Sequence, residues 1–316
     1  MKNKIWIVGG GNMGIEYSKI LTKRREDFTV IGRSEESAKK LKNSTGLDSF
    51  IGGLDLFLSK NPQAAKFAIV CVGVESLQNC TKKLIQFGVK NILVEKPAGL
   101  NANEVIDLYE TALQFNSHVY VAYNRRFYSS VLKSKELIER DGGVLSFTFD
   151  FTEMTQKIEK MKKAKGVKEN WLFANSTHVI DLAFFLGGSP QSLACNHISN
   201  LDWHPSGSVF VGNGLTINNI PFSYHSNWNS AGRWGVILLT ESMRLVLSPL
   251  EKLQVQQKDS FDIKYLDIDD SLDTQFKPGL YEMVNSFLSN YSNLKPLKDQ
   301  VDDLKIYSKI GNYNWL

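Results

Sequence analysis

The sequence predicts a two-domain α/β protein, with an N-terminal doubly wound parallel sheet and a C-terminal α+β domain built on a large, open, mostly antiparallel sheet. Over the first 122 residues, short apolar runs alternate with helical runs, which is typical of a parallel sheet covered on both faces. From about Gly143 the strand candidates alternate polar and apolar residues, which indicates a sheet with one covered face. A chain of 316 residues also exceeds the size at which one hydrophobic core stops growing. We therefore expect a nucleotide-binding domain over 1–122 and a substrate-binding and oligomerisation domain over 123–316.

The predicted elements follow from hydrophobic periodicity and from turn residues. The strands expected in the first domain are 4–8, 28–31, 67–72, 91–94 and 118–122, and the helices are 35–42, 75–87 and 101–115. The strands expected in the second domain are 145–151, 221–228 and 244–247. One helix is expected over 176–186, and Pro278 is placed to open another near the C-terminus.

The first strand runs directly into a glycine motif, Gly9-Gly10-Gly11-Asn12-Met13-Gly14, which is followed by a helical run. This order is the context in which G-x-G-x-x-G indicates a dinucleotide site. Gly9 would permit the tight turn, Gly11 the close approach of a pyrophosphate, and Gly14 the packing of the helix on the strand. The helix N-terminus would present free N–H groups to the phosphates. We expect Asn12 and Met13 to contact the cofactor as well.

The end of the second strand bears on the choice between NAD and NADP. An NAD site usually has an Asp or Glu here that binds the ribose hydroxyls, whereas this chain reads Gly32-Arg33-Ser34. Arg33 offers a planar cation suited to a 2′-phosphate. Ser34 either donates to the same phosphate or caps the next helix. We therefore predict a preference for NADP, with NAD possible.

Composition and charge exclude several classes of protein. Hydrophobic residues make up 42% of the chain and charged residues 22%, as in an ordinary globular protein. The formal net charge of +4 does not indicate a nucleic-acid partner. No apolar run approaches the roughly 18 residues that span a bilayer, and no signal peptide precedes the first strand. The three cysteines form no C-x-x-C pair, which fits a reducing compartment and gives no sign of a metal site. From these observations together we expect a cytoplasmic protein without a metal site or a membrane partner.

Four motifs in register resemble the glucose–fructose oxidoreductase, inositol dehydrogenase and rhizopine-catabolism (Gfo/Idh/MocA) family. They are the glycine motif, Glu95-Lys96-Pro97, Tyr123-Asn124-Arg125-Arg126-Phe127, and His178-Val179-Ile180-Asp181 with Leu186-Gly187-Gly188. In this family Glu-Lys-Pro follows the fifth strand. The resemblance spans residues 5 to about 190 and implies a Rossmann domain, NAD(P)-dependent oxidation or reduction of a sugar-like substrate, and a homo-oligomer, a dimer or tetramer, formed through the C-terminal sheet.

Lys96 is the first catalytic candidate. It follows an apolar strand at the carboxyl edge of the predicted sheet, where open α/β folds bind ligands. Its ammonium can stabilise alkoxide character on a substrate oxygen as hydride leaves the carbon. Pro97 restricts Lys96 to extended geometry, and the resemblance suggests a cis bond between them. We expect Glu95 to border the cofactor with Lys96.

His178 is the second candidate, because an imidazole can accept a hydroxyl proton near neutral pH. Residues 175–177 favour helix N-caps, and Asp181 lies on the same helix face as His178, where it could orient the ring. The family commonly has an aspartate four residues before this histidine, but here that residue is Ala174. Asn175 can fill part of that role, although it cannot take a proton.

Further residues are expected near the nicotinamide or the substrate, without an assigned chemical step. The resemblance places Asn124, and Tyr123 beside it, in the nicotinamide pocket, and Gly73 at its border, while Arg125 or Arg126 either lines this pocket or clamps the domain junction. The lysine-rich stretch from Lys157 to Lys168 is either a solvated loop or a lid over an anionic substrate. Candidate sugar contacts in the second domain are Trp171, His225, Trp228, Asn229 and Arg233, although strand alternation puts Trp228 on the opposite face from His225 and Asn229.

The main hypothesis is an NADP-preferring dehydrogenase or reductase of a sugar or nucleotide sugar. Lys96 would stabilise the reacting oxygen, and His178, assisted by Asn175, would exchange its proton. The alternative is a catalytically silent NADP-binding sensor or partner protein, which Ala174 motivates. The fold alone does not separate the two.

Overall fold

The computed structural model describes residues 4–315. The chain divides into two compact units. The first comprises residues 4–123 with the returning segment Leu280–Asp302, and the second comprises Asn124–Gly279 with residues 303–315. The segment 280–302 thus packs with the first unit, although it lies within the 123–316 range expected for the second domain. The functional assignment of the two domains stays a prediction.

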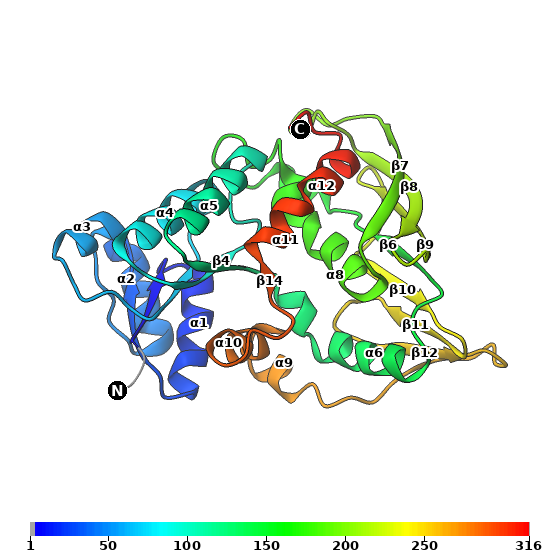
Figure 1. The fold of residues 1–316 in the computed structure, drawn as a ribbon, viewed down its shortest axis with the longest axis horizontal. Coiled ribbons are helices and arrows are strands. Elements are labelled where there is room, and N and C mark those ends of the chain that lie inside the picture. The colour runs from blue at the N-terminus through cyan, green and yellow to red at the C-terminus, as the bar shows by residue number, and fades with distance from the viewer. Residues whose placement is uncertain (1–3, 316) are drawn as a thin grey trace. The chain divides into compact units, whose positions relative to one another are not determined.

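The first unit is built on a six-stranded sheet in the order β14-β5-β4-β3-β1-β2 (Figure 1). All pairs are parallel except β14 with β5. The strands are β1 (Lys4–Val8), β2 (Asp27–Ile31), β3 (Phe67–Val70), β4 (Asn91–Glu95), β5 (His118–Ala122) and β14 (Lys295–Pro296). The centres of β1, β3 and β4 are wholly apolar and buried, because helices cover both faces of the sheet. The five strands expected here are therefore confirmed.

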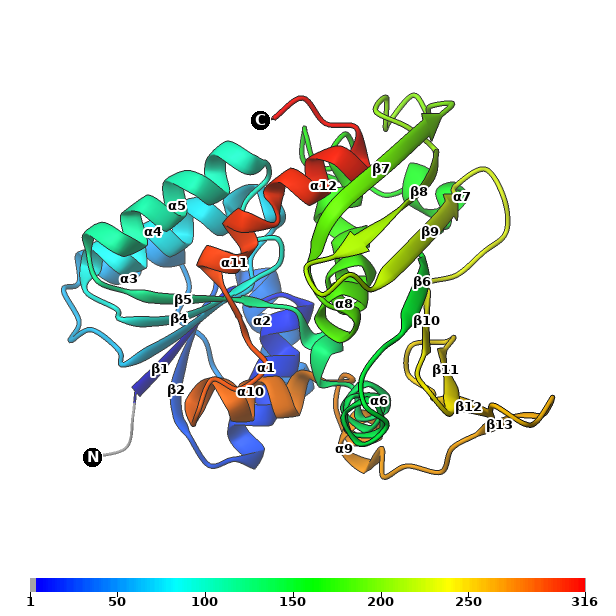
Figure 2. The same cartoon turned by 45° about the vertical axis from the view of Figure 1, so that its right-hand side comes forward.

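Helices lie on opposite faces of this sheet. Figures 1 and 2 show α4 (Leu77–Phe87) and α5 (Ala102–Gln114) on one face, with α1 (Asn12–Lys23) and α10 (Leu280–Leu288) on the other. The remaining helices of the unit are α2 (Glu35–Thr45), α3 (Gly53–Ser59), the 3₁₀ turn η1 (Val74–Ser76) and α11 (Leu297–Asp302). Between β2 and β3 the chain adds only one bridge, Ile31 to Phe50. Lys96 therefore follows β4, the fourth strand in chain order, and not a fifth strand as the resemblance implies.

The second unit is built on an eight-stranded sheet in the order β13-β12-β11-β10-β6-β9-β8-β7. The pairs are antiparallel apart from β6 with β9. The strands are β6 (Ser146–Asp150), β7 (Pro190–Ile198), β8 (Val209–Thr216), β9 (Pro221–Asn227), β10 (Gly235–Leu239), β11 (Met243–Leu247), β12 (Gln254–Gln257) and β13 (Ile263–Tyr265). The predicted fold class, a parallel Rossmann sheet followed by a mostly antiparallel one, is confirmed.

Helix α8 (Thr177–Gly187) packs on one face of this sheet against β6 and β10. The contact is aromatic: Phe184 meets Phe149 and Phe222 edge-on at 5.6 and 5.2 Å between ring centroids. The other helices are η2 (Asn124–Phe127), α6 (Ser129–Arg140), α7 (Thr155–Glu159), the π-helix η3 (Leu172–Ser176), α9 (Ser271–Gln275) and α12 (Leu304–Gly311). Alternate residues of β9 are buried, so the sheet has one covered face, as its sequence pattern predicts.

No helix within residues 4–315 is both long and apolar enough to cross a bilayer.

Candidate active site

The glycine motif forms the turn between β1 and α1. Gly9 has φ +123°, and a Cβ there would lie 2.6 Å from the carbonyl oxygen of Cys71. A Cβ at Gly14 would lie 1.9 Å from the carbonyl oxygen of Gly9. Within the described residues, a Cβ at Gly11 would meet no heavy atom within 4 Å. The first and third glycines are thus required by packing, whereas the second borders open space.

Helix α1 begins at this open space without a side chain over its end. Gly11 is the N-cap residue and makes no side-chain cap bond. The first N–H groups of a helix have no partners within the helix, so this end suits an anion. Lys40 on α2 donates to Oδ1 of Asn12 at 2.7 Å and adds a cation beside the first turn. The sequence analysis missed Lys40, because its 28-residue separation from Asn12 gave no local signal. These residues fit the pyrophosphate of a dinucleotide.

The loop after β2 becomes polar and exposed at Arg33 and Ser34. Arg33 is exposed directly after the strand. Oγ of Ser34 accepts from the N–H of Ser37 at 3.3 Å, so Ser34 caps α2. This hydrogen bond fits the helix-capping role, which was one of the two roles expected for Ser34. The binding of a 2′-phosphate by Arg33 stays a prediction.

The turn at Lys96 is held by buried hydrogen bonds. The Lys96–Pro97 bond is cis, and the N–H of Ala98 donates to the carbonyl of Glu95 at 3.0 Å, which closes a type VI turn. The buried amide of Gln300 on α11 donates to the carbonyl of Pro97 at 3.2 Å. Its oxygen accepts from the hydroxyl of Tyr123 at 3.2 Å. Tyr123 therefore braces the turn that carries half-buried Lys96.

Glu95 and Gly73 lie at the same carboxyl edge of the sheet. The hydroxyl of Tyr17 on α1 donates to Oε1 of Glu95 at 2.7 Å. Burial, and then the charge of Glu95, raise the pKa of Tyr17 well above its ordinary value. Burial likewise raises the pKa of the Cys71 thiol. Gly73 is exposed immediately before η1, at the end of the loop that follows β3.

In the second unit, the residues that follow β5 make structural contacts. Nδ2 of Asn124 donates to the carbonyl of Pro278 at 2.9 Å. Arg126 donates from Nε and Nη2 to the two carboxylate oxygens of Asp181, both at 2.7 Å. This bidentate pair joins η2 to α8. Arg126 thus binds both oxygens of Asp181, and the expected orientation of His178 by Asp181 stays a prediction.

His178 lies in the first turn of α8 and is buried, with 7% of its surface exposed. Its ring centroid is 6.1 Å from that of Trp234. The N-cap expected over residues 175–177 is not formed, because the π-helix η3 runs directly into α8 and Ser176 makes no side-chain cap bond. π-Helical turns are rare in proteins as a whole, and those that do occur are often found at functional sites.

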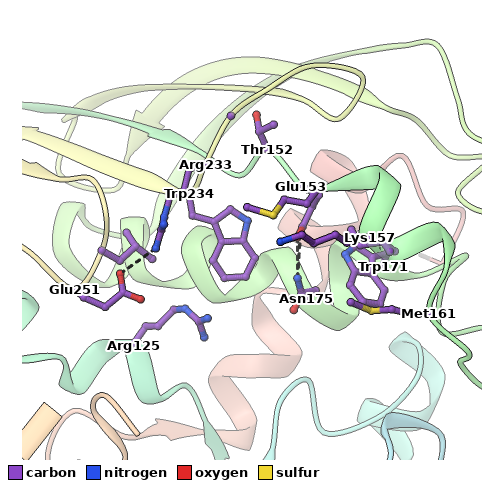
Figure 3. A pocket seen from close by; sticks show the side chains of 14 residues that line it. Arg125, Thr152, Glu153, Lys157, Met161, Trp171, Asn175, Arg233, Trp234 and Glu251 are labelled. Carbon is purple, nitrogen blue, oxygen red and sulfur yellow. Dashed lines mark hydrogen bonds and ion pairs between the residues drawn. The ribbon is translucent and has the colours of Figure 1, made fainter. Parts of the chain in front are cut away.

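A cavity of about 340 Å³ opens in the second unit beside η3 (Figure 3). Its walls combine two indoles, three cations and two carboxylates. They are Arg125, Thr152, Glu153, Met154, Lys157, Ile158, Met161, Trp171, Asn175, Gly232, Arg233, Trp234, Leu250 and Glu251. The cavity brings together Asn175 with Trp171 and Arg233, two of the five candidate sugar contacts.

Other expected sugar contacts lie outside this cavity. Trp228 is buried in the core, with its ring centroid 4.7 Å from that of His204. Asn229 donates to Oγ of Ser208 at 2.8 Å. His225 is exposed on β9, on the face opposite buried Tyr224, as strand alternation predicts. These three residues are not part of the same pocket as Trp171.

Glu153 is a functional candidate that the sequence analysis missed. It follows β6, is buried with 7% of its surface exposed, and lines the cavity. Oε1 of Glu153 accepts from Nδ2 of Asn175 at 2.9 Å and from Oγ of Ser176 at 2.7 Å. The opposite wall carries Arg233 and Glu251, 3.6 Å apart, and Trp234, with the Arg125 guanidinium 4.7 Å from its ring centroid.

The lysine-rich stretch borders the cavity at one end. Lys157 lines the wall, and Lys163 lies 6.0 Å from the ring centroid of Trp171. Lys168 donates to the carbonyl of Glu159 at 2.7 Å, which ties the stretch to the end of α7. Its role as a solvated loop or as a lid over an anionic substrate stays a prediction.

Histidine, cysteine and acidic side chains within residues 4–315 form no group of three or more suited to a metal ion.

The fold and the glycine turn define a dinucleotide-binding protein with a Rossmann domain. Residues 3–123 match the model of an oxidoreductase family, GFO_IDH_MocA, described as having an NAD-binding Rossmann fold. The resemblance of this domain to the Gfo/Idh/MocA family of NAD-binding oxidoreductases, which the four motifs predicted, is therefore confirmed over residues 3–123.

Three known proteins show the range of similarity. A redox-sensing transcriptional repressor, Rex, from Thermosipho africanus is 28% identical over 120 residues, which span 36% of this chain and 57% of that repressor's length. The structure of the WlbA dehydrogenase from Bordetella pertussis with NADH and UDP-GlcNAcA has a TM-score of 0.73 at 12% identity, covering 99% of this chain and 96% of that one. A levoglucosan dehydrogenase in complex with NADH and L-sorbose has a TM-score of 0.75 at 17% identity, with 99% and 96% covered. At these identities the two structures establish a shared fold.

Proposed function

We propose that this protein is an NADP-preferring dehydrogenase or reductase that acts on a CH–OH or carbonyl carbon of a sugar or nucleotide sugar. The observation that carries the proposal is the placement of Lys96. Strands β1 and β4 are parallel members of one sheet, so the glycine turn after β1 and the turn after β4 lie at the same edge. A cation fixed at that edge of an oxidoreductase-family domain is suited to stabilise a reacting oxygen.

His178, Lys96 and Asn175 have separate roles in the proposed oxidation of an alcohol. A bound nicotinamide accepts the hydride, that is, the hydrogen and both electrons of the breaking C–H bond. His178 takes the hydroxyl proton as the C=O bond forms, and returns it in the reverse reaction. Lys96 donates to the same oxygen and stabilises its partial negative charge. Asn175, on the cavity wall, accepts a hydrogen bond from a neighbouring hydroxyl.

The cofactor preference rests on the residues after β2. Arg33 is exposed there, Ser34 caps α2, and Gly32 precedes both, so no carboxylate occupies the position that binds the ribose hydroxyls in NAD sites. We propose that Arg33 binds the 2′-phosphate of NADP through charge-assisted hydrogen bonds. Gly9, Gly11, Asn12, Met13, Gly14, Gly73, Glu95 and Asn124 complete the proposed cofactor contacts.

The cavity supports a sugar-like substrate with negative charge. Trp171 and Trp234 offer aromatic faces on which a pyranose ring can pack, and Arg125, Lys157 and Arg233 offer three cations. The relatives bound to UDP-GlcNAcA and L-sorbose support the same substrate class. A homo-oligomer formed through the exposed face of the eight-stranded sheet, and a cytoplasmic location, remain predictions.

The test is a steady-state comparison across sugars and nucleotide sugars with NADP and NAD. Lys96→Met and His178→Asn should keep cofactor affinity within a few-fold while lowering turnover by about 10²–10⁴, the usual contribution of a positioned acid or base. Loss of the fold or of cofactor binding in either variant would show that the residue is structural and that its assigned role is wrong.

A catalytically silent NADP-binding sensor is the second candidate. The relative named a redox-sensing repressor matches part of this chain, and Ala174 removes a carboxylate common in the family. A sensor would bind NADPH tightly, turn over no substrate, and behave identically with Lys96→Ala. The half-buried Lys96 on its braced turn favours the enzyme.

A further inference from the structure

Strand β13 is an end strand of the eight-stranded sheet, and all three of its side chains are exposed. It pairs antiparallel with β12, with Ile263 opposite Gln256. Figure 2 shows this hairpin projecting from the end of the sheet. Phe261, just before the strand, is 100% exposed, and Ile263 and Tyr265 are 46% and 67% exposed. Large apolar side chains at alternate positions of a sheet edge are typical of a strand that pairs with another chain.

The hydrogen bonds of the hairpin indicate which backbone groups of β13 face outward. The N–H of Leu266 donates to the carbonyl of Leu253 at 2.9 Å. In an antiparallel pair every second residue bonds to the partner strand, so Lys264 is the next residue that bonds to β12. The backbone N–H and C=O groups of Ile263 and Tyr265 therefore point to the outer edge of the sheet. A strand added at this edge would bond to these two residues.

The turn that carries Phe261 is held by hydrogen bonds within the hairpin. The N–H of Ser260 donates to the carbonyl of Gln257 at 3.1 Å, and Nε2 of Gln256 donates to the carbonyl of Ser260 at 3.0 Å. The N–H of Asp262 donates to Oγ of Ser260 at 3.1 Å. Because this turn is already closed, less conformational entropy is lost when the edge meets a partner.

The sequence of this edge is complementary to itself in the antiparallel direction. It reads Phe261-Asp262-Ile263-Lys264-Tyr265. A two-fold axis at Ile263 places Phe261 opposite Tyr265 of a second copy, and Asp262 opposite its Lys264. Aromatic pairs and pairs of opposite charge across two strands are both stabilising. The same axis makes Ile263 a hydrogen-bonded pair with its own equivalent, as its outward backbone groups require. Axes at Asp262 or Lys264 would instead bring two like charges together.

We propose that this protein forms a symmetric dimer in which the β13 strands of two copies pair antiparallel about Ile263 and join the two eight-stranded sheets edge to edge. The contact is isologous, because the same residues of both copies meet, so it closes as a dimer. It differs from the association through the exposed sheet face expected above, and it does not depend on the proposed function. Since few residues of each copy take part, the interface belongs to the small class, and the dimer should dissociate in the micromolar range.

The first test determines the register by cysteine cross-linking. Across the axis the Cα atoms of the two residues 263 would lie about 5.5 Å apart, within disulfide range. The two residues 265 would lie roughly 13 Å apart along the strands, which no disulfide bridges. Under mild oxidation Ile263→Cys should therefore form a covalent dimer about tenfold faster, or more, than the matched control Tyr265→Cys. The wild type, whose three cysteines are buried or half-buried, is the second control. Equal rates in the two variants would overturn the proposal.

The second test reverses the charges and measures association by sedimentation velocity, over protein concentrations from about 1 to 500 μM. Lys264→Asp would face each aspartate with another one and should weaken the dimer about tenfold or more. Asp262→Lys should weaken it equally. The double variant Asp262→Lys with Lys264→Asp restores both pairs and should recover the wild-type dissociation constant. Failure of the double variant to recover would overturn the proposal.

These charge variants should leave the fold intact. The side chains of Asp262 and Lys264 are 73% and 79% exposed, and the ion pair that they form within one copy spans 3.7 Å. An exposed ion pair of this kind contributes little to stability. A lower association constant in the single variants therefore reports on the contact between copies.

A third variant acts on the backbone. Ile263→Pro removes an N–H that points to the outer edge and leaves the bonds to β12, so it should retain the melting temperature and abolish the dimer. Leu239→Lys is the control, because Leu239 is 40% exposed on the open face of β10 and lies outside this edge. A wild type that stays monomeric at every concentration would overturn the proposal, as would a dimer lost in Leu239→Lys and kept in Ile263→Pro. If Ile263→Pro fails to fold, the charge variants decide.

Discussion

The ion pair between Arg126 and Asp181 gives the sharpest prediction about the stability of the second unit. Their side chains are 11% and 1% exposed, and two hydrogen bonds of 2.7 Å join them. Asp181→Asn leaves a buried guanidinium without its counter-charge. Breaking a buried pair in this way costs about 3–5 kcal/mol. For a unit of this size each kcal/mol shifts Tm by roughly 2–4 °C, so Tm should fall by about 6–20 °C.

Thermal unfolding followed by tryptophan fluorescence suits this test. Five of the six tryptophans lie in the second unit, at positions 171, 203, 228, 234 and 315. The control is the double variant Arg126→Met with Asp181→Leu, which removes both charges and should recover most of the loss. A loss below about 1 kcal/mol in Asp181→Asn would refute the reasoning, because it would place the pair in the range of an exposed one.

Three further predictions concern the cofactor site and the core. Arg33→Ala should lower the affinity for NADPH by about ten- to a hundredfold, which is the effect of one charge-assisted hydrogen bond, and should lower the affinity for NADH far less. Equal losses of affinity for the two cofactors in calorimetric titration would show that Arg33 does not bind the 2′-phosphate. Gly14→Ala should destabilise the first unit, because the added methyl would lie 1.9 Å from the carbonyl oxygen of Gly9. Gly11→Ala should preserve the melting temperature but lower the cofactor affinity. Similar melting temperatures for the two variants would contradict this contrast. Burial lowers the pKa of His204 from 6.5 to about 4, so the unfolded chain binds the proton more tightly. The free energy of unfolding should be highest above pH 6.5 and decline as the pH falls toward 4, and urea titrations of His204→Gln should show a shallower decline; an equal decline would exclude His204 as its source.

The sequence predicted the first unit well because its signals are local. Each parallel strand is a short apolar run, and the glycine motif lies between a strand and a helix. The returning segment was missed because Lys295 pairs with Val121, far away in the sequence, and a two-residue strand has no periodicity. Helix α6, which follows closely after the Tyr123–Phe127 motif, was missed as well.

The candidate site was predicted in part for a related reason. Lys96, His178 and Asn175 belong to motifs whose order can be recognised in the sequence. Glu153 is a single carboxylate after a strand, and its partner Asn175 is 22 residues away. Trp234 and Glu251 come from separate segments that only the fold brings to one cavity. The ion pair of Asp181 with Arg126 was not predicted, because helical spacing shows which side chains share a face but not which tertiary partner binds them.

The central claim is that this chain moves hydride between a nicotinamide and a sugar-like carbon, and isotope transfer tests it most directly. The purified protein is incubated with NADPH carrying deuterium at the reactive C4 position and with a mixture of oxidised sugars and nucleotide sugars. The account predicts that mass spectrometry finds an alcohol product that carries the deuterium on carbon, and that Lys96→Met forms far less of it. Tight binding of NADPH with no labelled product from any member of the mixture would contradict the account.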